Sequence, residues 1–592
     1  MLAIEGKNLR KRFTTRMPGS FLSGPPVDAL RGVSLSVADG EIFGIVGESG
    51  SGKSTLARVL IGATAADGGT VELYGAPLGA TRDVARIVQM VPQDSTSTLN
   101  PRLNLLDAVA FGPWARGEGA AQARRLAGEA LERVGLPPAQ FGRRRPSEIS
   151  GGQRQRVNLA RAIVLKPRIL FLDEPVSALD KTVQAQILNL LVDLGRDLGL
   201  TMVMISHDLD VVRYLCARTA VMRDGEIVEN APTDQLFAAP QHDYTKVLVA
   251  TLPSHYGAPR LPAPAAPTPL LRFDHIAVTF VHKGGSTRAV RGASLSLDPG
   301  ETLAIVGESG SGKSVMLRAL MGLLPASAEV SGSIEFSGTR VDATDTNRLA
   351  RFRGRTAGMV FQNPLGSLDA MAPIGRQLED VVIALRGVPR AAARDIALGL
   401  LERVHLSAAR HRYGAMPHEL SGGQRQRVGI AMALAGQPPL LLADEPTTAL
   451  DVSVQARILD LLQQLTAEEK LGLVLVTHDI AVARQMADRV AVMYAGRIVE
   501  LGPAATVLDR PAHPYSQILL RSFMGVRQRQ MPLPSLPGAP PRLLSEPAGC
   551  AFAARCPVAQ PQCHTVSPRR TPLAGGYAEC LLVHAPGATE HA

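Results

Sequence analysis

Cysteine and aromatic residues are scarce in this chain of 592 residues, which has five cysteines and one tryptophan. Cys216 stands alone, and the other four cysteines lie beyond residue 549. A small secreted protein held together by disulfides would distribute its cysteines through the whole chain. The pattern excludes that class, and we expect a reducing compartment.

Long apolar runs are missing as well. No uncharged apolar stretch reaches the roughly 18 residues that a membrane-spanning helix needs, and the N-terminus has a strand pattern rather than a basic region followed by an apolar one. Hydrophobic residues make up 45% of the chain and charged residues 20%, as in globular proteins. We therefore expect no transmembrane helix and no signal peptide, and sizeable cores in about four compact units.

A clustered basic surface is also lacking, although the net charge is +10 and the isoelectric point is near 9.6. Lysine is scarce, arginine is spread over the whole chain, and the densest cluster, Arg143 to Arg145, is short. Nucleic-acid binding would favour a basic stripe or patch. We interpret the charge as a solvated, arginine-rich surface and expect no nucleic-acid partner.

A phosphate-binding loop is present, and it is present twice. Each copy has the pattern GxxxxGKS after a short apolar run, a pattern that places backbone N–H groups and a helix N-terminus around a polyphosphate. Its lysine would reach the β- and γ-phosphates of that group, and the serine after it would offer a hydroxyl to Mg²⁺. The loop residues are Gly47, Ser49, Gly50, Gly52, Lys53, Ser54 and Thr55, and then Gly307, Ser309, Gly310, Gly312, Lys313, Ser314 and Val315.

Strands and helices alternate around the first loop. The pattern predicts strands at 2–13, 33–37, 86–93, 169–175 and 201–208, a Gly/Pro-rich loop at 16–26, and a helix at 121–134 that stops before a glycine. Ser150 is placed to cap a further helix. This alternation predicts an α/β fold with a parallel sheet, in which ligands bind at the carboxyl ends of the strands.

The whole set then recurs in the same order, which predicts two tandem domains. We expect the first domain at 1–252, a Pro/Ala-rich linker at 253–269, the second domain at 270–530, and a Pro-rich linker with a cysteine-bearing tail at 531–592.

Four further residue types recur with the loops and suit phosphoryl transfer to water. Each copy has an Asp to hold the Mg²⁺ shell, a Glu to orient or activate water, a His to bond the γ-phosphate, and a Gln to sense metal and water. Alone, each has an ordinary structural explanation, such as a helix cap or a satisfied core histidine. Their repetition favours catalysis by Asp173, Glu174, His207 and Gln93, and by Asp444, Glu445, His478 and Gln362.

Together with Ser150-Gly151-Gly152-Gln153 and Ser421-Gly422-Gly423-Gln424, these motifs resemble the full motif set of the ABC transporter ATPases. The resemblance implies two P-loop domains, each with a RecA-like core and a helical subdomain, stacked head to tail. Each ATP would then lie between one phosphate loop and the other domain's Ser-Gly-Gly-Gln signature. It also implies that Phe13 and Phe280 stack on adenine.

Finer features are similar to the dipeptide/oligopeptide importers. Residues 172–180 resemble the F-type subunit of that group and residues 443–451 the D-type, and 513–520 resembles a segment typical of it, with an echo at 242–245. The resemblance implies an ATP-hydrolysing energy subunit, peripheral on the cytoplasmic face of the inner membrane. Its partners would be two permease subunits and an extracytoplasmic solute-binding protein. Import of nickel, glutathione or another peptide-like solute remains an alternative, and a soluble ATPase acting on ribosomes or DNA a remote one.

The tail carries Cys550, Cys556, Cys563 and Cys580, and it is similar to the cysteine-bearing tail of D-type importer subunits. Four thiolates suit a [4Fe–4S] cluster or zinc, and the cysteines could also be unliganded. The spacing lacks the paired CxxC typical of structural zinc. We therefore favour an iron–sulfur cluster.

Overall fold

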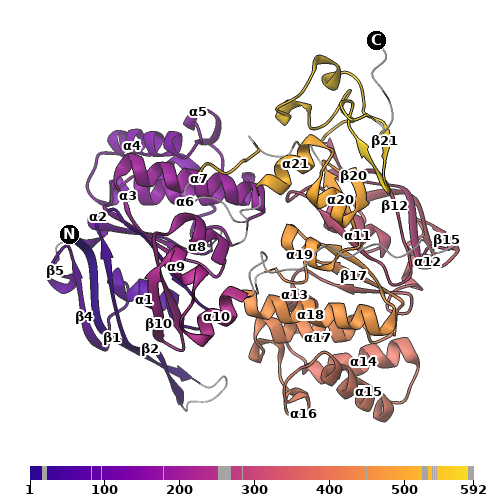
Figure 1. Ribbon diagram of the computed structural model, residues 1–592, viewed down its shortest axis with the longest axis horizontal. Coiled ribbons are helices and arrows are strands. Elements are labelled where there is room, and N and C mark those ends of the chain that lie inside the picture. Colours follow the sequence, from indigo (N-terminus) through magenta and orange to yellow (C-terminus); the bar gives the residue numbers. More distant parts are fainter. Residues whose placement is uncertain are drawn as a thin grey trace.

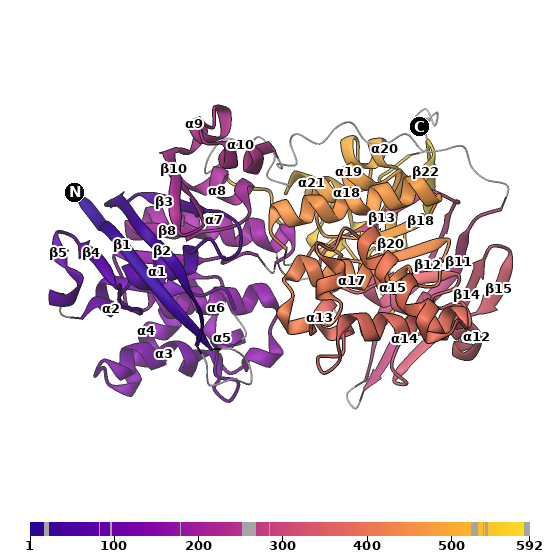
Figure 2. The ribbon, with the colours of Figure 1, turned by 90° about the horizontal axis from the view of Figure 1, so that it is seen from below.

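The computed structural model describes residues 1–16, 23–81, 83–94, 97–177, 179–250, 268–282, 285–448, 450–522, 531–536, 538, 541 and 543–584. They form two halves that lie side by side, the first ending at residue 250 and the second beginning at residue 268 (Figures 1 and 2). The predicted linker at 253–269 falls almost entirely outside the described residues.

Each half begins with an antiparallel sheet. In the first half its order is β2-β1-β4-β5, with bounds β1 Leu2–Arg16, β2 Ser23–Ala38, β4 Gly68–Leu73 and β5 Ala76–Pro77. Along β2, Val33, Leu35 and Val37 are buried while Ser34 is exposed, as the alternation predicts.

The predicted loop at 16–26 is wrong in its second part, because Ser23 to Pro26 begin β2. Pro26 pairs with Thr14 of β1. A proline has no N–H to donate, but β2 is the edge strand of this sheet, where one side of the strand needs no partner.

The second sheet is mostly parallel, and the predicted site residues lie at the carboxyl ends of its strands. Its order in the first half is β10-β9-β3-β8-β7-β6. Every residue of β7 and β8 is buried, as continuous apolar runs in a two-sided sheet require. The bounds are β3 Ile42–Val46, β6 Val88–Val91, β7 Ile169–Asp173, β8 Thr201–Ile205, β9 Arg218–Arg223 and β10 Glu226–Pro232.

Helices cover this sheet and form a separate group between β6 and β7. The helix predicted at 121–134 is present as α4, and Gly135 follows it in the left-handed region at φ 72°. Arg86 and Ile87, predicted as strand, instead end the short helix α2. The helices are α1 Lys53–Leu60, α2 Val84–Ile87, α3 Leu105–Ala115, α4 Ala120–Arg133, α5 Pro138–Phe141, α6 Gly151–Ile163, α7 Lys181–Leu198, α8 Leu209–Leu215, α9 Thr233–Ala238 and α10 Asp243–Ala250.

The second half repeats both sheets in the same spatial order, β12-β11-β14-β15 and β16-β17-β18-β13-β19-β20. The strands are β11 Leu271–His282, β12 Gly285–Leu297, β13 Thr302–Val306, β14 Ala328–Phe336, β15 Thr339–Asp342, β16 Ala357–Val360, β17 Leu440–Asp444, β18 Gly472–Val476, β19 Arg489–Tyr494 and β20 Arg497–Pro503. The helices are α11 Lys313–Leu320, α12 Thr346–Ala350, α13 Pro364–Ser367, α14 Ile374–Arg386, α15 Arg390–Arg403, α16 Ala409–Arg412, α17 Gly422–Ala433, α18 Val452–Glu469, α19 Ile480–Met486, α20 Ala504–Asp509 and α21 Pro514–Arg521.

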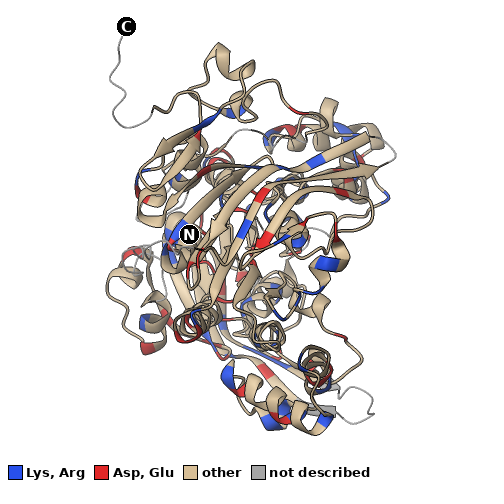
Figure 3. Ribbon diagram, turned by 90° about the vertical axis from the view of Figure 1, so that its right-hand side faces the viewer, with Lys and Arg blue, Asp and Glu red and all other residues tan. Residues whose placement is uncertain are grey.

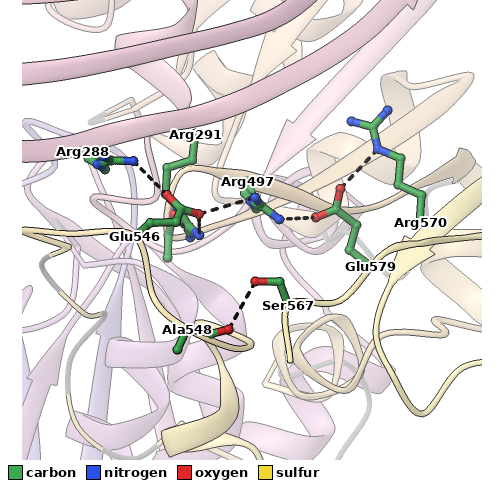
Figure 4. Close-up of polar contacts among 9 residues, drawn as sticks. Arg288, Arg291, Arg497, Glu546, Ala548, Ser567, Arg570 and Glu579 are labelled. Carbon is green, nitrogen blue, oxygen red and sulfur yellow. Dashed lines mark hydrogen bonds and ion pairs between the residues drawn. The ribbon is translucent and has the colours of Figure 1, made fainter. Parts of the chain in front are cut away.

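The tail is part of the second half's sheet rather than a separate unit. Its hairpin, β21 Arg570–Leu573 and β22 Gly576–Glu579, extends the sheet beyond β20. Figure 4 shows Glu546 among three arginines of the second half, with Glu579 paired to Arg497 and Arg570. The pairs of Glu546, and that of Glu579 with Arg497, fasten the tail to the rest of the second half before Cys550 and just before Cys580.

Basic and acidic residues are interspersed along the ribbon in Figure 3. In the described part of the chain, no helix combines the length and the apolar character that crossing a membrane requires.

Candidate functional site

The first phosphate loop lies between β3 and α1 and holds all the loop residues named from the sequence. Gly52 has φ 101°, and a Cβ there would lie 2.4 Å from the carbonyl oxygen of Ala29, so only glycine fits. Lys53 is 6% exposed, and its Nζ donates to the carbonyl oxygens of Gly47 and Glu48, both at 2.7 Å. Burial lowers the pKa of Lys53, while the nearby carboxylate of Glu174 opposes that shift. The loop thus holds an ammonium group where phosphates would bind.

The second loop, between β13 and α11, repeats this geometry. Lys313 donates to the carbonyl oxygens of Gly307 and Glu308 at 2.7 and 2.8 Å. Both loops are also supported from behind by a tyrosine hydroxyl. Tyr244 accepts from the N–H of Glu48 at 3.0 Å, and Tyr515 accepts from the N–H of Glu308 at 2.8 Å. The two importer-type segments at 242–245 and 513–520 therefore brace the phosphate loops, a role that the sequence did not indicate.

The serine and the aspartate predicted to hold Mg²⁺ meet in both halves. The hydroxyl of Ser54 donates to Asp173 at 3.1 Å, and that of Ser314 donates to Asp444 at 2.7 Å. Burial raises the pKa of both aspartates. Oδ2 of Asp444 is buried without a hydrogen-bond partner among the described residues, and a buried unpaired carboxylate oxygen is costly unless a cation or donor meets it. A hydroxyl and a carboxylate with a free oxygen fit the hard-oxygen preference of Mg²⁺.

Glutamine, glutamate and histidine form one hydrogen-bonded group at the end of β7 and β8. Oε2 of Glu174 accepts from Gln93 at 2.7 Å and lies 3.1 Å from Nδ1 of His207. Burial alone would raise the pKa of Glu174, but the bond and charge of His207 outweigh it and lower the pKa. Burial likewise lowers the pKa of His207, yet Glu174 raises it overall. Glu174 also has φ 48°, an unusual backbone for a glutamate, and such positions gather at functional sites.

The second group has the same geometry and one additional bond. Oε2 of Glu445 accepts from Gln362 at 3.0 Å and lies 3.1 Å from Nδ1 of His478. Thr448 donates to the same oxygen at 2.8 Å. Burial would raise the pKa of Glu445, but the bonds from His478 and Thr448 prevail and lower it to about 2. The corresponding Ser177 in the first half donates to the backbone carbonyl of Glu174 instead.

The two signatures begin helices α6 and α17, as predicted. Ser150 caps α6 by accepting from the N–H of Gln153, whose side chain accepts from the N–H of Ser150 in return. Ser421 and Gln424 form the same capping box. A Cβ at Gly152 would lie 2.3 Å from Val183 of α7, so the second glycine lets the signature helix meet α7 closely.

Each half touches the phosphate loop of the other. Asp451, before α18, accepts from the N–H and the hydroxyl of Ser49 at 3.0 and 2.8 Å. Asp180, before α7, accepts from the N–H of Ser309 at 3.3 Å. Two residues after each aspartate, Ser453 donates to Glu48 at 2.7 Å and Thr182 donates to Glu308 at 2.8 Å. The halves therefore face each other head to tail.

Two further predictions, the contact of each signature with the opposite phosphate loop and the stacking of two phenylalanines on adenine, are not tested by these contacts. In the described part of the chain, no hydrogen bond joins either signature to the opposite phosphate loop. Phe13 lies on β1, 42% exposed, with the ammonium of Lys11 5.6 Å from its ring centre. Phe280 lies on β11, partly buried against the core of the second half. Neither position tests the predicted contact with adenine.

The four tail cysteines are brought into one neighbourhood. All are free thiols, the N–H of Cys550 donates to the carbonyl of Cys563, and burial and mutual repulsion raise the pKa of Cys550, Cys556 and Cys580. Among the described residues, however, no group of three or more His, Cys, Asp or Glu is arranged to hold a metal ion. As they lie here, the thiols do not form the predicted cluster site.

Comparison with known proteins agrees with this geometry. The sequence pattern of the ABC transporter family matches residues 30–177 and 290–448. The pattern described as "Oligopeptide/dipeptide transporter, C-terminal region" matches residues 228–272 and 499–563.

Two relatives carry the same description, "Glutathione import ATP-binding protein GsiA". The protein of Escherichia coli K12 is 37% identical over 547 residues, covering 83% of this chain and 86% of that protein. The protein of Pectobacterium atrosepticum is 37% identical over 548 residues, covering 84% and 86%. Among solved structures, cbiO1 of Clostridium perfringens is 26% identical, with a TM-score of 0.35, and covers 40% of this chain and 91% of that chain. The chain therefore belongs to the ABC transporter family, in the group with the oligopeptide/dipeptide C-terminal region, and is the ATP-hydrolysing subunit of an importer.

Proposed function

We propose that this ATPase powers uptake of a small peptide or peptide-like solute through two separate permease subunits fed by an extracytoplasmic binding protein. The match to the oligopeptide/dipeptide C-terminal region supports the solute class. Glutathione is the first candidate within that class, because it is itself a small peptide and is the solute that the relatives' names give. Nickel remains the alternative outside it. The chain would lie on the cytoplasmic face of the inner membrane, with its domains at 1–252 and 270–530.

The proposal includes two composite ATP sites. One would use Lys53, Gln93, Glu174 and His207 with the signature Ser421 to Gln424, and the other Lys313, Gln362, Glu445 and His478 with Ser150 to Gln153. The single observation that carries this is the pair of contacts from Asp451 to Ser49 and from Asp180 to Ser309. Each brings the helix that packs on one signature to the opposite phosphate loop.

Within each site, the chain's own residues would divide the work of phosphoryl transfer. The loop lysine would exchange its carbonyl partners for phosphate oxygens, and the Ser–Asp pair would hold Mg²⁺, which neutralises phosphate charge when bound. The ionised glutamate would orient water and take its proton, while the histidine that touches the same carboxylate would donate to the γ-phosphate. ATP would favour the closed arrangement of the two halves, and hydrolysis would release it.

A groove next to Gln93 is a candidate docking place for a permease. The groove has a volume of about 230 Å³ and lies between β6, α3 and α6, with Gln89, Met90 and Phe111 among its lining residues. Phe111 and Trp114 are 56% and 57% exposed, and their ring centres are 5.9 Å apart. In the second half, Phe361, Leu365 and Met371 are exposed after the matching strand. Large exposed apolar side chains mark partner surfaces.

Purification of a tagged Glu174→Gln, Glu445→Gln chain with ATP, from its native membranes in mild detergent, tests the proposal. We expect two multi-span permeases and a binding protein to come with it, and mass spectrometry of the retained ligand to identify a peptide or glutathione. A Trp114→Glu variant should lose permease while keeping ATP binding, whereas Trp114→Phe should keep both. Ribosomal proteins or DNA in place of permeases would overturn the importer function.

The cysteine tail carries a separate proposal, that Cys550, Cys556, Cys563 and Cys580 bind an iron–sulfur cluster. Four free thiols in one neighbourhood support it, and the lack of a metal-holding arrangement among the described residues counts against it. Chain purified without oxygen should show broad absorbance near 400 nm and contain iron, as iron–sulfur proteins do. Colourless protein with zinc, or with neither metal, would refute the cluster.

A further inference from the structure

The tail crosses from the second half to the first before it reaches its cysteines. In the first half, Asn189 of α7 donates to the carbonyl of Leu533 at 2.8 Å and accepts from its N–H at 2.9 Å. Tyr214 donates to the carbonyl of Met531 at 2.7 Å. Leu533 is 3% exposed and lies in the hydrophobic core of the first half. Figure 1 shows this gold-coloured segment beside α7.

Further on, the tail reaches the phosphate loop of the second half. Both terminal nitrogens of Arg555 donate to the carboxylate of Glu308, at 2.8 and 2.9 Å. The pair is buried, with side chains 8% and 2% exposed. The same carboxylate accepts from Thr182, at the start of α7. A two-pronged arginine–carboxylate pair is strong and sets direction as well as distance.

An aromatic pocket holds Arg555 in place. Phe552 is 1% exposed, and its ring centre lies 5.2 Å from that of Tyr494 and 5.5 Å from that of Tyr515. Tyr494 also accepts from Arg555 at 3.2 Å. The same Tyr515 supports the N–H of Glu308, so the pocket and the loop form one packed unit.

Within the described residues, the first half has no such arrangement. Its Glu48 accepts from Ser453, as Glu308 does from Thr182, but among the described residues no arginine pairs with it. Arg223 holds the position that Tyr494 holds in the second half, and it is 53% exposed and paired with Asp224. Two otherwise matched phosphate loops thus differ in whether the acidic residue of the loop is neutralised.

We propose that Arg555 is a positioning residue for the second ATP site: it neutralises Glu308 and fixes it against Thr182, so that the tail prepares this site, and not the first, for ATP. This rests on the proposed assignment of Lys53 and Lys313 to separate ATP sites. Without the guanidinium, a buried carboxylate would face the incoming phosphates. With it, the loop and the start of α7 are held in one geometry.

Each site can be measured alone in the full chain, with fluorescent mant-ATP and Mg²⁺. The Lys53→Ala variant keeps only the second ATP site, and the Lys313→Ala variant keeps only the first. The double variant should not bind mant-ATP. This result checks the assignment of the two sites independently of Arg555. In the Lys53→Ala background we expect Arg555→Ala to weaken binding about tenfold, the size of one charge-assisted interaction. In the Lys313→Ala background, Arg555→Ala should change the affinity for mant-ATP less than about twofold, because indirect effects of a distant substitution are of that order.

Removing the charge of Glu308 together with that of Arg555 gives a second test. Adding Glu308→Gln to Arg555→Ala should restore most of the affinity, because the uncompensated charge is gone, and Arg555→Lys should restore part of it. Phe552→Leu loosens the pocket without touching Glu308 and serves as the control for tail packing. Equal losses at both sites, no loss at either, no rescue by Glu308→Gln, or a full loss in Phe552→Leu would each overturn the proposal.

Discussion

The hydroxyl of Ser49 donates to the carboxylate of Asp451 at 2.8 Å, although the two residues belong to opposite halves of the chain. Asp451 begins α18, and its side chain makes no helix-capping hydrogen bond. Its carboxylate is therefore free to serve the phosphate loop of the first half. The matching Asp180 has two tasks, since it bonds the N–H of Ser309 and also caps α7 through the N–H of Val183.

Because Asp180 caps a helix and Asp451 does not, variants of the two residues separate an effect on ATP hydrolysis from an effect on stability. Asp451→Ala should lower steady-state ATP hydrolysis about tenfold, the value of roughly 1.4 kcal/mol in the barrier, with little change in thermal unfolding. Asp180→Ala should show a similar loss of turnover and, in addition, about 1 kcal/mol less stability from the lost cap. Phosphate release and calorimetry measure the two quantities. Wild-type turnover in Asp451→Ala would show that the contact does not serve catalysis.

Removal of the ionised glutamates should abolish hydrolysis while sparing ATP binding. A positioned base contributes about 10²- to 10⁴-fold, so Glu174→Gln with Glu445→Gln should reduce turnover at least a hundredfold. Glutamine keeps the shape and still accepts one hydrogen bond. Glu129→Gln, on the exposed face of α4, is the control. Undiminished phosphate release from the double variant would refute the catalytic assignment.

His513 should make the chain sensitive to mild acid. It is 1% exposed, its Nδ1 accepts from the N–H of Tyr515 at 3.0 Å, and burial lowers its pKa from 6.5 to about 4. Between those values the unfolded chain binds a proton that the folded chain does not, so this stability is present above pH 6.5 and is lost as the pH falls towards 4. The loss is on the order of 3 kcal/mol, at about 1.4 kcal/mol per pKa unit.

His513→Asn tests this, because asparagine can accept the same capping bond but does not titrate in this range. We expect its melting temperature to change less between pH 7.5 and pH 4.5 than that of the natural chain. His242→Asn, the matching change in the first half, is the control. An identical acid response in His513→Asn and the natural chain would contradict the prediction.

Asp210 should act with the opposite sign. Burial and repulsion by Asp208 raise its pKa to about 7, against the attraction of Lys181, and Asp479 of the second half adds to the repulsion. Between pH 3.8 and about 7 the folded chain keeps a proton that the unfolded chain has released, so stability falls as the pH rises through this window.

Asp210→Asn mimics the protonated form, so it should raise the melting temperature at pH 8 and change it little at pH 5. Asp224→Asn, with a side chain 74% exposed, should have no pH-dependent effect. A stabilisation that is equal at both pH values would show that Asp210 is not the titrating group.

Much of each candidate site could be predicted from the sequence, because its parts are local. A loop between a buried strand and a helix, or a carboxylate at the end of an apolar run, is set by a few neighbouring residues. Gln93, Glu174 and His207 were predicted to act together because the same set recurs in the second half. Their side chains meet because parallel strands end at one edge of the sheet. The start of β2 was missed because Pro25 and Pro26 are typical of loops and are tolerated here only at a sheet edge.

The sequence by itself determined the chemistry: two phosphate loops, two sets of carboxylates with their histidines, and a chain that repeats. Only the tertiary structure decided which residues of one half serve the other. The bonds from Asp451 to Ser49, from Thr182 to Glu308, and from Arg555 to Glu308 join residues far apart in the chain. No periodicity or local propensity records such pairs, because they depend on how whole cores pack and on which buried charge needs a partner.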